Sequence, residues 1–280
     1  MKGALIGDIA GSRFEFNNVQ KWEFDLLHPL CKVTDDSLMT LAIAKTLYEC
    51  RYDYRAIPTV VVNNMREIAH KHPNVGWGAR FRKWLFVDQY PRPYNSYGNG
   101  SAMRVSPVAW VANSEDEVKR LSQMVTEVTH NHPEGLKGAE AIAMATYLAR
   151  TGKSKEEIRA RMVEYYPILK DPNFTIEKIR PFYGYDDAGD WVTCQGSVPQ
   201  AIEAFLDSTD FENAVRLAVW LGGDCDTIGC MCGAIAEAFY GIPAEMDSKL
   251  MSYLSDDLAA ILQTFDKVKK PRVSRAASKS

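Results

Sequence analysis

The 280-residue sequence has no apolar run approaching the roughly 20 residues that a helix needs to cross a bilayer, so no membrane association is expected. Basic residues are not in excess: the net charge is −3, which makes nucleic acid an improbable partner. A signal peptide is not expected, because Asp8 interrupts the short apolar stretch after Met1. The six cysteines include no second pair at zinc-finger spacing. We therefore expect reduced thiols in a cytoplasmic protein.

Alternation of apolar and polar residues with a period of two is also scarce, and no strand–helix alternation or internal repeat is visible. The best strand candidate, residues 59–62, runs directly into a helical pattern. Apolar residues instead recur at helical spacing, with helices expected to begin near Thr34, Pro199 and Asp210, to stop at Gly241, and to cover residues 250–262. These patterns predict an all-α fold, a compact single-domain bundle of many helices over residues 1–266. A basic, disordered tail is expected over residues 267–280.

Two acidic clusters are the most informative feature that is present. Residues 34–37 read Thr-Asp-Asp-Ser and residues 223–227 read Gly-Asp-Cys-Asp-Thr, each at an expected helix start. Helix capping is one interpretation, since Asp, Ser and Thr accept hydrogen bonds from free backbone N–H groups. Capping explains one acid per helix, but two adjacent acids repel each other and their unpaired burial is costly. A divalent cation such as Mg²⁺ resolves this conflict, because hard cations bind carboxylate and hydroxyl oxygens.

Other candidate site features lie outside these clusters. Glu15 stands between Phe14 and Phe16, and such a glutamate is either exposed, salt-bridged, or a tuned acid, base or movable metal ligand. Segments rich in Gly, Pro and Asn cover residues 73–78, 91–100, 131–138 and 181–196. Loops of this length in a helical protein often line a site.

Five motifs in order, from about residue 2 to residue 240, resemble the ADP-ribosylglycohydrolase family, which includes the bacterial dinitrogenase reductase-activating glycohydrolase and the eukaryotic ADP-ribosylhydrolases. The motifs are Gly7-Asp8-x-x-Gly11 with Glu15-Phe16, Thr34-Asp35-Asp36-Ser37, Ser96-Tyr97-Gly98-Asn99-Gly100-Ser101-Ala102-Met103-Arg104, Thr129-His130 with Gly138-Ala139, and Gly223-Asp224-Cys225-Asp226-Thr227. Each motif alone is weak, but five in the right order are a strong signal. Ser37 stands where the family more often has Thr, a change that keeps the hydroxyl.

The resemblance implies an all-α fold with two Mg²⁺ or Mn²⁺ ions in a central cleft. By motif match, the metal ligands are Thr34, Asp35, Asp36, Asp224, Asp226 and Thr227. The substrate-binding residues are Ser96, Tyr97, Gly98, Asn99, Gly100, Ser101, Met103 and His130, in a glycine-rich loop whose backbone N–H groups can cradle a diphosphate. The catalytic residues are Glu15, Asp36 and Asp224. Asp8 is expected to support or cap rather than to coordinate.

The resemblance further implies a hydrolase that cleaves the ribosyl C1″ bond of an ADP-ribosylated protein or small molecule and releases ADP-ribose. Glu15 or an aspartate such as Asp224 would accept the proton of the attacking water, and the sequence leaves open which one. The linkage that is cleaved is open as well, since residues 76–88 show no marker for it. Two alternatives remain: a catalytically inactive relative that binds ADP-ribose or has a structural role, and a two-metal phosphatase or phosphodiesterase.

Overall fold

The structure, a computed structural model, describes residues 1–183 and 190–273 and is built from helices. The longer helices are α1 (Lys2–Gly11), α2 (Asp35–Glu49), α3 (Ile57–Lys71), α4 (Ala79–Phe86), α7 (Glu115–Thr126), α8 (Pro133–Arg150), α9 (Lys155–Val163), α11 (Cys194–Asp207), α12 (Phe211–Leu221), α13 (Cys225–Tyr240) and α15 (Asp256–Asp266). The shorter ones are α5 (Gly100–Met103), α6 (Pro107–Val111), α10 (Ile176–Ile179) and α14 (Ala244–Leu250), with turns of 3-10 helix at Tyr54–Ala56, Pro167–Lys170, Arg180–Phe182, Asp190–Val192 and Met251–Tyr253.

The all-α expectation is confirmed. Within the described residues there is no β-strand, and the only extended pairing is an isolated antiparallel bridge between Gly98 and Thr193. Residues 59–62, the best strand candidate, lie inside α3. None of the helices in the described part of the chain combines the length and the apolar character of a membrane span.

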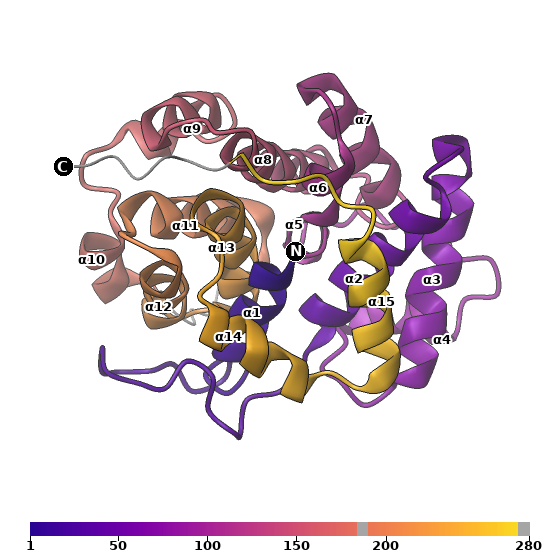
Figure 1. Cartoon of the computed structure of the whole chain (residues 1–280), viewed down its shortest axis with the longest axis horizontal. Coiled ribbons are helices and arrows are strands. Elements are labelled where there is room, and N and C mark those ends of the chain that lie inside the picture. Colours follow the sequence, from indigo (N-terminus) through magenta and orange to yellow (C-terminus); the bar gives the residue numbers. More distant parts are fainter. Residues whose placement is uncertain (184–189, 274–280) are drawn as a thin grey trace.

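Helices α1 and α13 lie side by side at the centre of the molecule (Figure 1), and glycines bring their backbones together. A Cβ atom added to Gly7 would lie 1.9 Å from the carbonyl oxygen of Gly229, and one added to Gly11 would lie 2.3 Å from the Cα of Asp226. Any side chain would therefore push the two helices apart. The close packing places Asp8 of α1 beside Asp226 in the first turn of α13.

Several helix boundaries agree with the sequence analysis. Helix α2 follows Thr34, whose hydroxyl accepts a hydrogen bond from the amide of Asp36 at 3.4 Å. Helix α12 follows Asp210, whose carboxylate accepts from the amide of Asn213 at 2.9 Å. Helix α13 ends at Tyr240, directly before Gly241, which caps it with a φ of +85°. Short polar side chains at a helix start and glycine at a helix end are the signals that made these boundaries predictable.

Two predicted boundaries are wrong. Helix α11 begins at Cys194, and Pro199 lies inside it rather than at its start; the side chain of Thr193 caps the helix by accepting from the amide of Gly196 at 3.1 Å. Residues 250–262 are not one helix, because α14 ends at Leu250 and α15 begins at Asp256. Apolar residues of both pieces face the core, so helical periodicity continues across the break.

The chain continues past α15 along the surface of other helices. Helix α15 itself packs beside α2 (Figure 1). Beyond it, the amide of Lys270 donates to the carbonyl of Trp110 at 2.7 Å and that of Val273 to the carbonyl of Arg150 at 2.8 Å. Residues 274–280 of the expected tail lie outside the described residues. The division of the chain at residue 266 stays a prediction.

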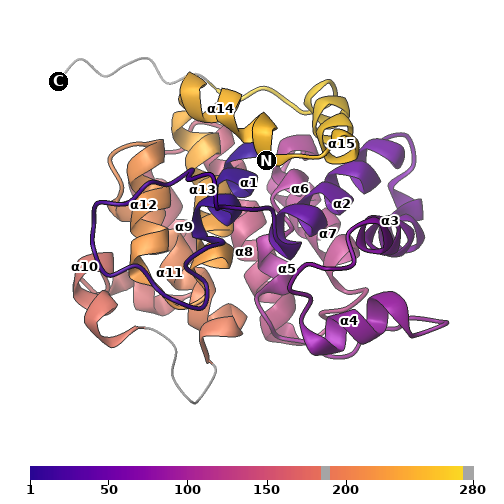
Figure 2. The same cartoon turned by 90° about the horizontal axis from the view of Figure 1, so that it is seen from below.

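The irregular segment between α1 and α2 carries Glu15 and crosses α12 (Figure 2). Arg216 of α12 donates to the carbonyl of Phe24 at 2.8 Å. Asn18 bonds to Gly223 in both directions, from its amide group to the glycine carbonyl at 3.0 Å and from the glycine N–H to its side-chain oxygen at 2.8 Å. These contacts fix the segment against the loop that precedes α13.

Candidate metal centre and ligand cleft

Five carboxylates from separate parts of the chain meet at the centre of the molecule. One oxygen each of Asp8, Asp36 and Asp226 lies within 4.8 Å of the other two, and the same holds for Glu15, Asp224 and Asp226. Asp226 belongs to both groups. The two acidic clusters that are far apart in the sequence therefore share one site.

These carboxylates are removed from water. Asp8, Asp36 and Asp226 are 0%, 2% and 2% exposed, and among the described residues none of the three forms an ion pair with a lysine or arginine. Burial, followed by repulsion from neighbouring acids, raises the pKa of Asp36 and Asp226 well above the ordinary range. For the half-buried Glu15, burial and then the charge of Asp224 raise the pKa to about 7.

Hydrogen bonds satisfy one of these acids but not another. Asp8 accepts from the amides of Thr34 and Ser37 at 3.1 and 3.0 Å and from the hydroxyl of Thr34 at 2.5 Å, so it caps α2 from a neighbouring helix. Asp36 is different: its Oδ1 is buried and has no hydrogen-bond partner among the described residues. A buried carboxylate oxygen without a partner carries a large desolvation cost, which a bound cation would offset.

The chemistry of the donor set fits a hard divalent cation. The side chains at the centre offer carboxylate and threonine hydroxyl oxygens, the ligands that Mg²⁺ and Mn²⁺ prefer. The sulfur of Cys225, which stands between the two aspartates, lies 3.6 Å from the carbonyl oxygen of Gly11 on α1. In the loop before Asp224, Gly222 and Gly223 have φ angles of +92° and +62°, a backbone conformation that residues other than glycine rarely adopt.

A cavity of about 460 Å³ opens over the carboxylates. Six of the residues that line it belong to the predicted metal-binding and catalytic residues: Glu15, Asp35, Asp36, Asp224, Asp226 and Thr227. Five more belong to the predicted substrate-binding residues: Ser96, Asn99, Gly100, Met103 and His130. Asn99 connects the two sets, because its side-chain amide donates to Asp224 Oδ2 at 2.6 Å. The central loop and the acidic clusters therefore form one cleft.

The remaining predicted residues lie around this cleft rather than on its wall. Thr34 is buried behind it, bonded to Asp8. The hydroxyl of Ser101 donates to the carbonyl of Gly135 at 2.8 Å. Tyr97 is 46% exposed, and its ring centroid lies 5.1 Å from that of His132. The roles given to these side chains stay predictions.

Two amides of the glycine-rich loop are already used inside the protein. The N–H of Gly98 donates to the hydroxyl of Ser96 at 3.2 Å, and the N–H of Asn99 donates to the carbonyl of Val192 at 2.9 Å. The first bond lies within the loop, and the second holds the loop against the segment before α11. They also leave fewer of its amides for a phosphate than the sequence pattern suggested.

Several lining residues were not singled out from the sequence: Gly76, Gly78, Ala79, Arg80, Phe81, Tyr94, Arg104, Trp191 and Val192. Most come from the irregular segments at residues 73–78, 91–100 and 181–196, so the loop composition did indicate the right regions. Arg104 closes the central motif but carried no signal of its own. A cation in that position is recognisable only once the fold shows that it faces the cleft.

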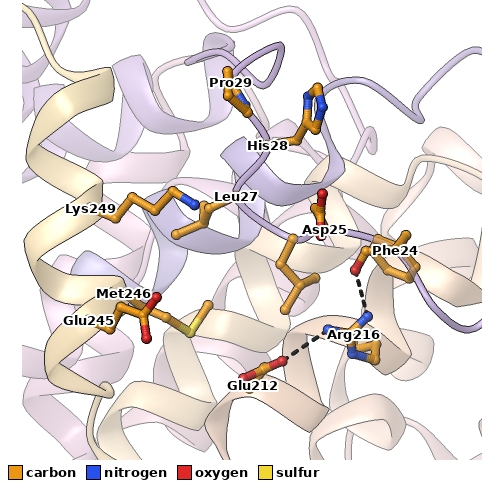
Figure 3. A pocket seen from close by; sticks show the side chains of 11 residues that line it. Phe24, Asp25, Leu27, His28, Pro29, Glu212, Arg216, Glu245, Met246 and Lys249 are labelled. Atoms are coloured by element: carbon orange, nitrogen blue, oxygen red, sulfur yellow. Dashed lines mark hydrogen bonds and ion pairs between the residues drawn. The ribbon is translucent and has the colours of Figure 1, made fainter.

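A separate hollow of about 350 Å³ lies between the segment before α2, α12 and α14 (Figure 3). Two of its charged side chains pair with each other: Arg216 donates to Glu212 at 2.9 Å, and it also donates to the carbonyl of Phe24 at 2.8 Å. Neither acidic cluster reaches this hollow. The arrangement of Arg216 is that of a structural anchor.

Both the sequence and the fold of the chain are similar to those of known proteins. The sequence profile of the family described as ADP-ribosylglycohydrolase matches residues 1–273. An ADP-ribosylhydrolase ARH3 from Gallus gallus is 27% identical over 312 residues, covering 86% of this chain and 84% of the relative. An ADP-ribosylarginine hydrolase Tri1 from Pseudomonas putida is 27% identical over 277 residues, covering 86% of this chain and 70% of the relative.

A solved structure titled ADP-ribosylglycohydrolase-related protein complex has the same fold, with a TM-score of 0.66, 23% identity and 95% of both chains covered. The match of the family profile extends over nearly the whole sequence and includes every residue of the cleft described above. The chain therefore belongs to the ADP-ribosylglycohydrolase family.

Proposed function

We propose that the protein is a metal-dependent hydrolase that cleaves the ribosyl C1″ bond of an ADP-ribosylated target and releases ADP-ribose. One observation carries the proposal: carboxylates of both acidic clusters converge beneath a single cleft whose wall also contains the central loop. Membership in the family, and relatives named as ADP-ribosylhydrolases, support the substrate class.

The proposed metal ligands are Thr34, Asp35, Asp36, Asp224, Asp226 and Thr227. Two observations support this set: Oδ1 of Asp36 is buried without a hydrogen-bond partner among the described residues, and Asp226 belongs to both carboxylate groups. Two Mg²⁺ or Mn²⁺ ions bound there would supply Lewis-acid polarisation of water and of the sugar hydroxyls. Asp8 supports the set from behind, since it orients Thr34 through two hydrogen bonds.

Proton transfer is assigned to Glu15. The side chain is half-buried, lines the cleft, and comes from an irregular segment that is anchored to the loop before α13. Asp224, the other candidate, has its Oδ2 engaged by Asn99 at 2.6 Å, which suits a fixed position better than it suits a proton acceptor. A carboxylate in the position of Glu15 can accept the proton of water as that water attacks the anomeric carbon.

The test is a panel of ADP-ribosylated substrates with arginine, serine and small-molecule linkages, each assayed with EDTA, Mg²⁺ or Mn²⁺. We expect release of ADP-ribose from at least one substrate with a divalent metal and none with EDTA. The arginine linkage belongs in the panel because the Pseudomonas putida relative is named for it. Calorimetric binding of ADP-ribose without turnover of any substrate would instead indicate an inactive reader, and release of phosphate would indicate a phosphatase.

A further inference from the structure

A buried arginine, a threonine and a histidine form a chain of hydrogen bonds at the wall of the cleft. The guanidinium Nη2 of Arg104 donates to the hydroxyl of Thr129 at 2.6 Å. The same hydroxyl lies 2.7 Å from Nδ1 of His130. Arg104 and His130 are 1% and 4% exposed, and Thr129 is fully buried. Arg104 and His130 also line the cavity over the carboxylates.

The positions of the hydrogen atoms follow from the bonding capacity of a hydroxyl. Thr129 has one proton to give, and one of its lone pairs is taken by Arg104. The proton can go to Nδ1 of His130 at 2.7 Å or to the carbonyl of Thr126 at 3.4 Å, which is at the edge of hydrogen-bond length. If Nδ1 carried a proton, two N–H groups would converge on the Thr129 oxygen and its own proton would be left with the long contact. A relay in which each group donates to the next is the more stable arrangement.

The charge near the ring favours a neutral imidazole. Burial and then the positive charge of Arg104 lower the pKa of His130 well below its ordinary value. Of the aromatic rings nearby, that of Tyr94 has its centroid 6.1 Å from the imidazole. A neutral ring whose Nδ1 accepts from Thr129 must carry its proton on Nε2.

The Nε2 atom of His130 faces the glycine-rich loop. A Cβ atom added to Gly100 would lie 3.6 Å from it, and one added to Gly98 would lie 3.8 Å from it. Among the described residues, no hydrogen bond to Nε2 is formed. A nearly buried N–H group beside the glycine-rich loop, with no acceptor among the residues that the structure describes, is arranged to meet an acceptor on a ligand.

We infer that Arg104 and Thr129 are positioning residues that fix His130 in its Nε2–H form, so that His130 donates a hydrogen bond to a phosphoryl oxygen of the ligand. The inference rests on the proposed function for the identity of that ligand, ADP-ribose. A phosphoryl oxygen is an acceptor only and carries negative charge, and both properties suit a fixed donor that is backed by a buried guanidinium. His130 then has no proton to take up or release during catalysis.

The test uses Thr129→Val, which removes the hydroxyl at nearly constant shape, and Thr129→Ser, which keeps it. Nitrogen-15 NMR of the ligand-free protein reads which ring nitrogen carries the proton, and loss of one signal in His130→Gln assigns it among the five histidines. We expect Nε2–H in the wild type and in Thr129→Ser, and a mixture of the two forms in Thr129→Val. By calorimetry, Thr129→Val should bind ADP-ribose about 10-fold more weakly, and Thr129→Ser within about twofold of wild type.

Each of the two measurements can contradict the inference by itself. A proton on Nδ1 of His130 in the wild type overturns the inference, whether or not the valine variant folds. Equal affinity of the valine and serine variants for ADP-ribose overturns it as well. A wild-type protein that shows no binding of ADP-ribose overturns the proposed function and the ligand assigned to Nε2. The spectra of the same sample still show which ring nitrogen of His130 carries the proton, and so test the hydrogen-bond chain separately.

Discussion

At Asp36, helix capping and metal binding make different demands. A capping carboxylate accepts from backbone N–H groups at the start of its own helix. For α2 that work is done by Thr34, whose hydroxyl accepts from the Asp36 amide, and by Asp8, which accepts from the Thr34 and Ser37 amides. Asp36 is left buried, with an oxygen that has no partner among the described residues. This division of roles supports its assignment as a ligand.

Replacing Asp36 by Asn should therefore abolish most activity. The amide keeps the shape but removes the negative charge and one ligand oxygen, so we expect release of ADP-ribose to fall by at least about 100-fold, beyond the loss typical of residues that only support a ligand. Steady-state assays at saturating Mg²⁺ and Mn²⁺ measure this. Asp116→Asn, at an exposed position in the first turn of α7, is the matched control and should stay within about twofold of wild type. Near-normal turnover in the Asp36 variant would remove it from the ligand set.

Asn99 allows a second test at the scale of one contact. Its amide donates to Asp224 Oδ2 at 2.6 Å and so orients a proposed ligand without being one. Asn99→Ala should weaken the affinity for Mn²⁺ by about 10-fold or more, measured by calorimetric titration. The exposed Asn63, changed to Ala in the same way, should leave the affinity unchanged. An Asn99 variant with wild-type affinity would show that this bond serves the loop only.

The acids of this cleft could be identified from the sequence, whereas several of its other residues could not. Paired aspartates at helix starts are unusual enough to demand an explanation on their own. Arg104 and Tyr94 have no such pattern, because an arginine or tyrosine at a loop end is common and mostly exposed. The position of the buried Arg104 and the partly buried Tyr94 near His130 results from how the chain packs around the cleft, and sequence spacing does not encode that contact.

Among the elements, the α1–α13 pair determines whether the site can form. Asp8 and Asp226 come within 4.8 Å only because the two helices touch through backbone atoms at Gly7 and Gly229. Glycine in a helix interior costs up to about 1 kcal/mol relative to alanine. The fold accepts that cost in exchange for bringing two proposed site elements into contact.

Gly7→Ala should consequently lower both stability and metal affinity. The new Cβ would stand 1.9 Å from the Gly229 carbonyl oxygen, so α1 must shift away from α13. We expect a loss of roughly 1–3 kcal/mol in the free energy of unfolding, which exceeds the gain in helix propensity. Chemical denaturation and Mn²⁺ titration measure the two effects. Gly76→Ala is the control, since its Cβ would meet nothing within 4 Å; equal stability of the two variants would contradict the packing argument.

Helix boundaries were predictable where the side chain of the preceding residue caps the helix. Thr34 and Asp210 cap their helices through their own side chains, and both starts were expected. The start of α11 was missed because Pro199, a usual helix opener, lies within the helix instead. The break between α14 and α15 was missed because the apolar period spans it. In both cases the position where the helix begins or ends depends on packing against the core more than on the local sequence.

For the molecule as a whole, the converging carboxylates set the pH dependence of stability. Burial and neighbouring acids raise the pKa of these groups in the folded state, to about 8 for Asp35. A raised folded-state pKa means that these groups bind more protons in the folded chain than in the unfolded chain between about pH 4 and pH 8. Without metal, the contribution of these groups to stability is therefore fully present below the ordinary carboxyl pKa and is lost as the pH rises toward 8. Cations bound at the proposed site would reverse this trend, because they favour the deprotonated ligands and would bind only the folded state.

Thermal unfolding between pH 5 and pH 8 tests this linkage. In EDTA the wild-type Tm should fall as the pH rises, by roughly 2 °C for each kcal/mol lost in a chain of this size, while Asp36→Asn should show a shallower fall because one buried charge is gone. At pH 8 in EDTA the variant should therefore be the more stable protein. Saturating Mn²⁺ should raise the wild-type Tm far more than that of the variant and reverse their order. If wild type and variant respond alike to pH and to Mn²⁺, the carboxylates are neutralised by some means other than a shared cation.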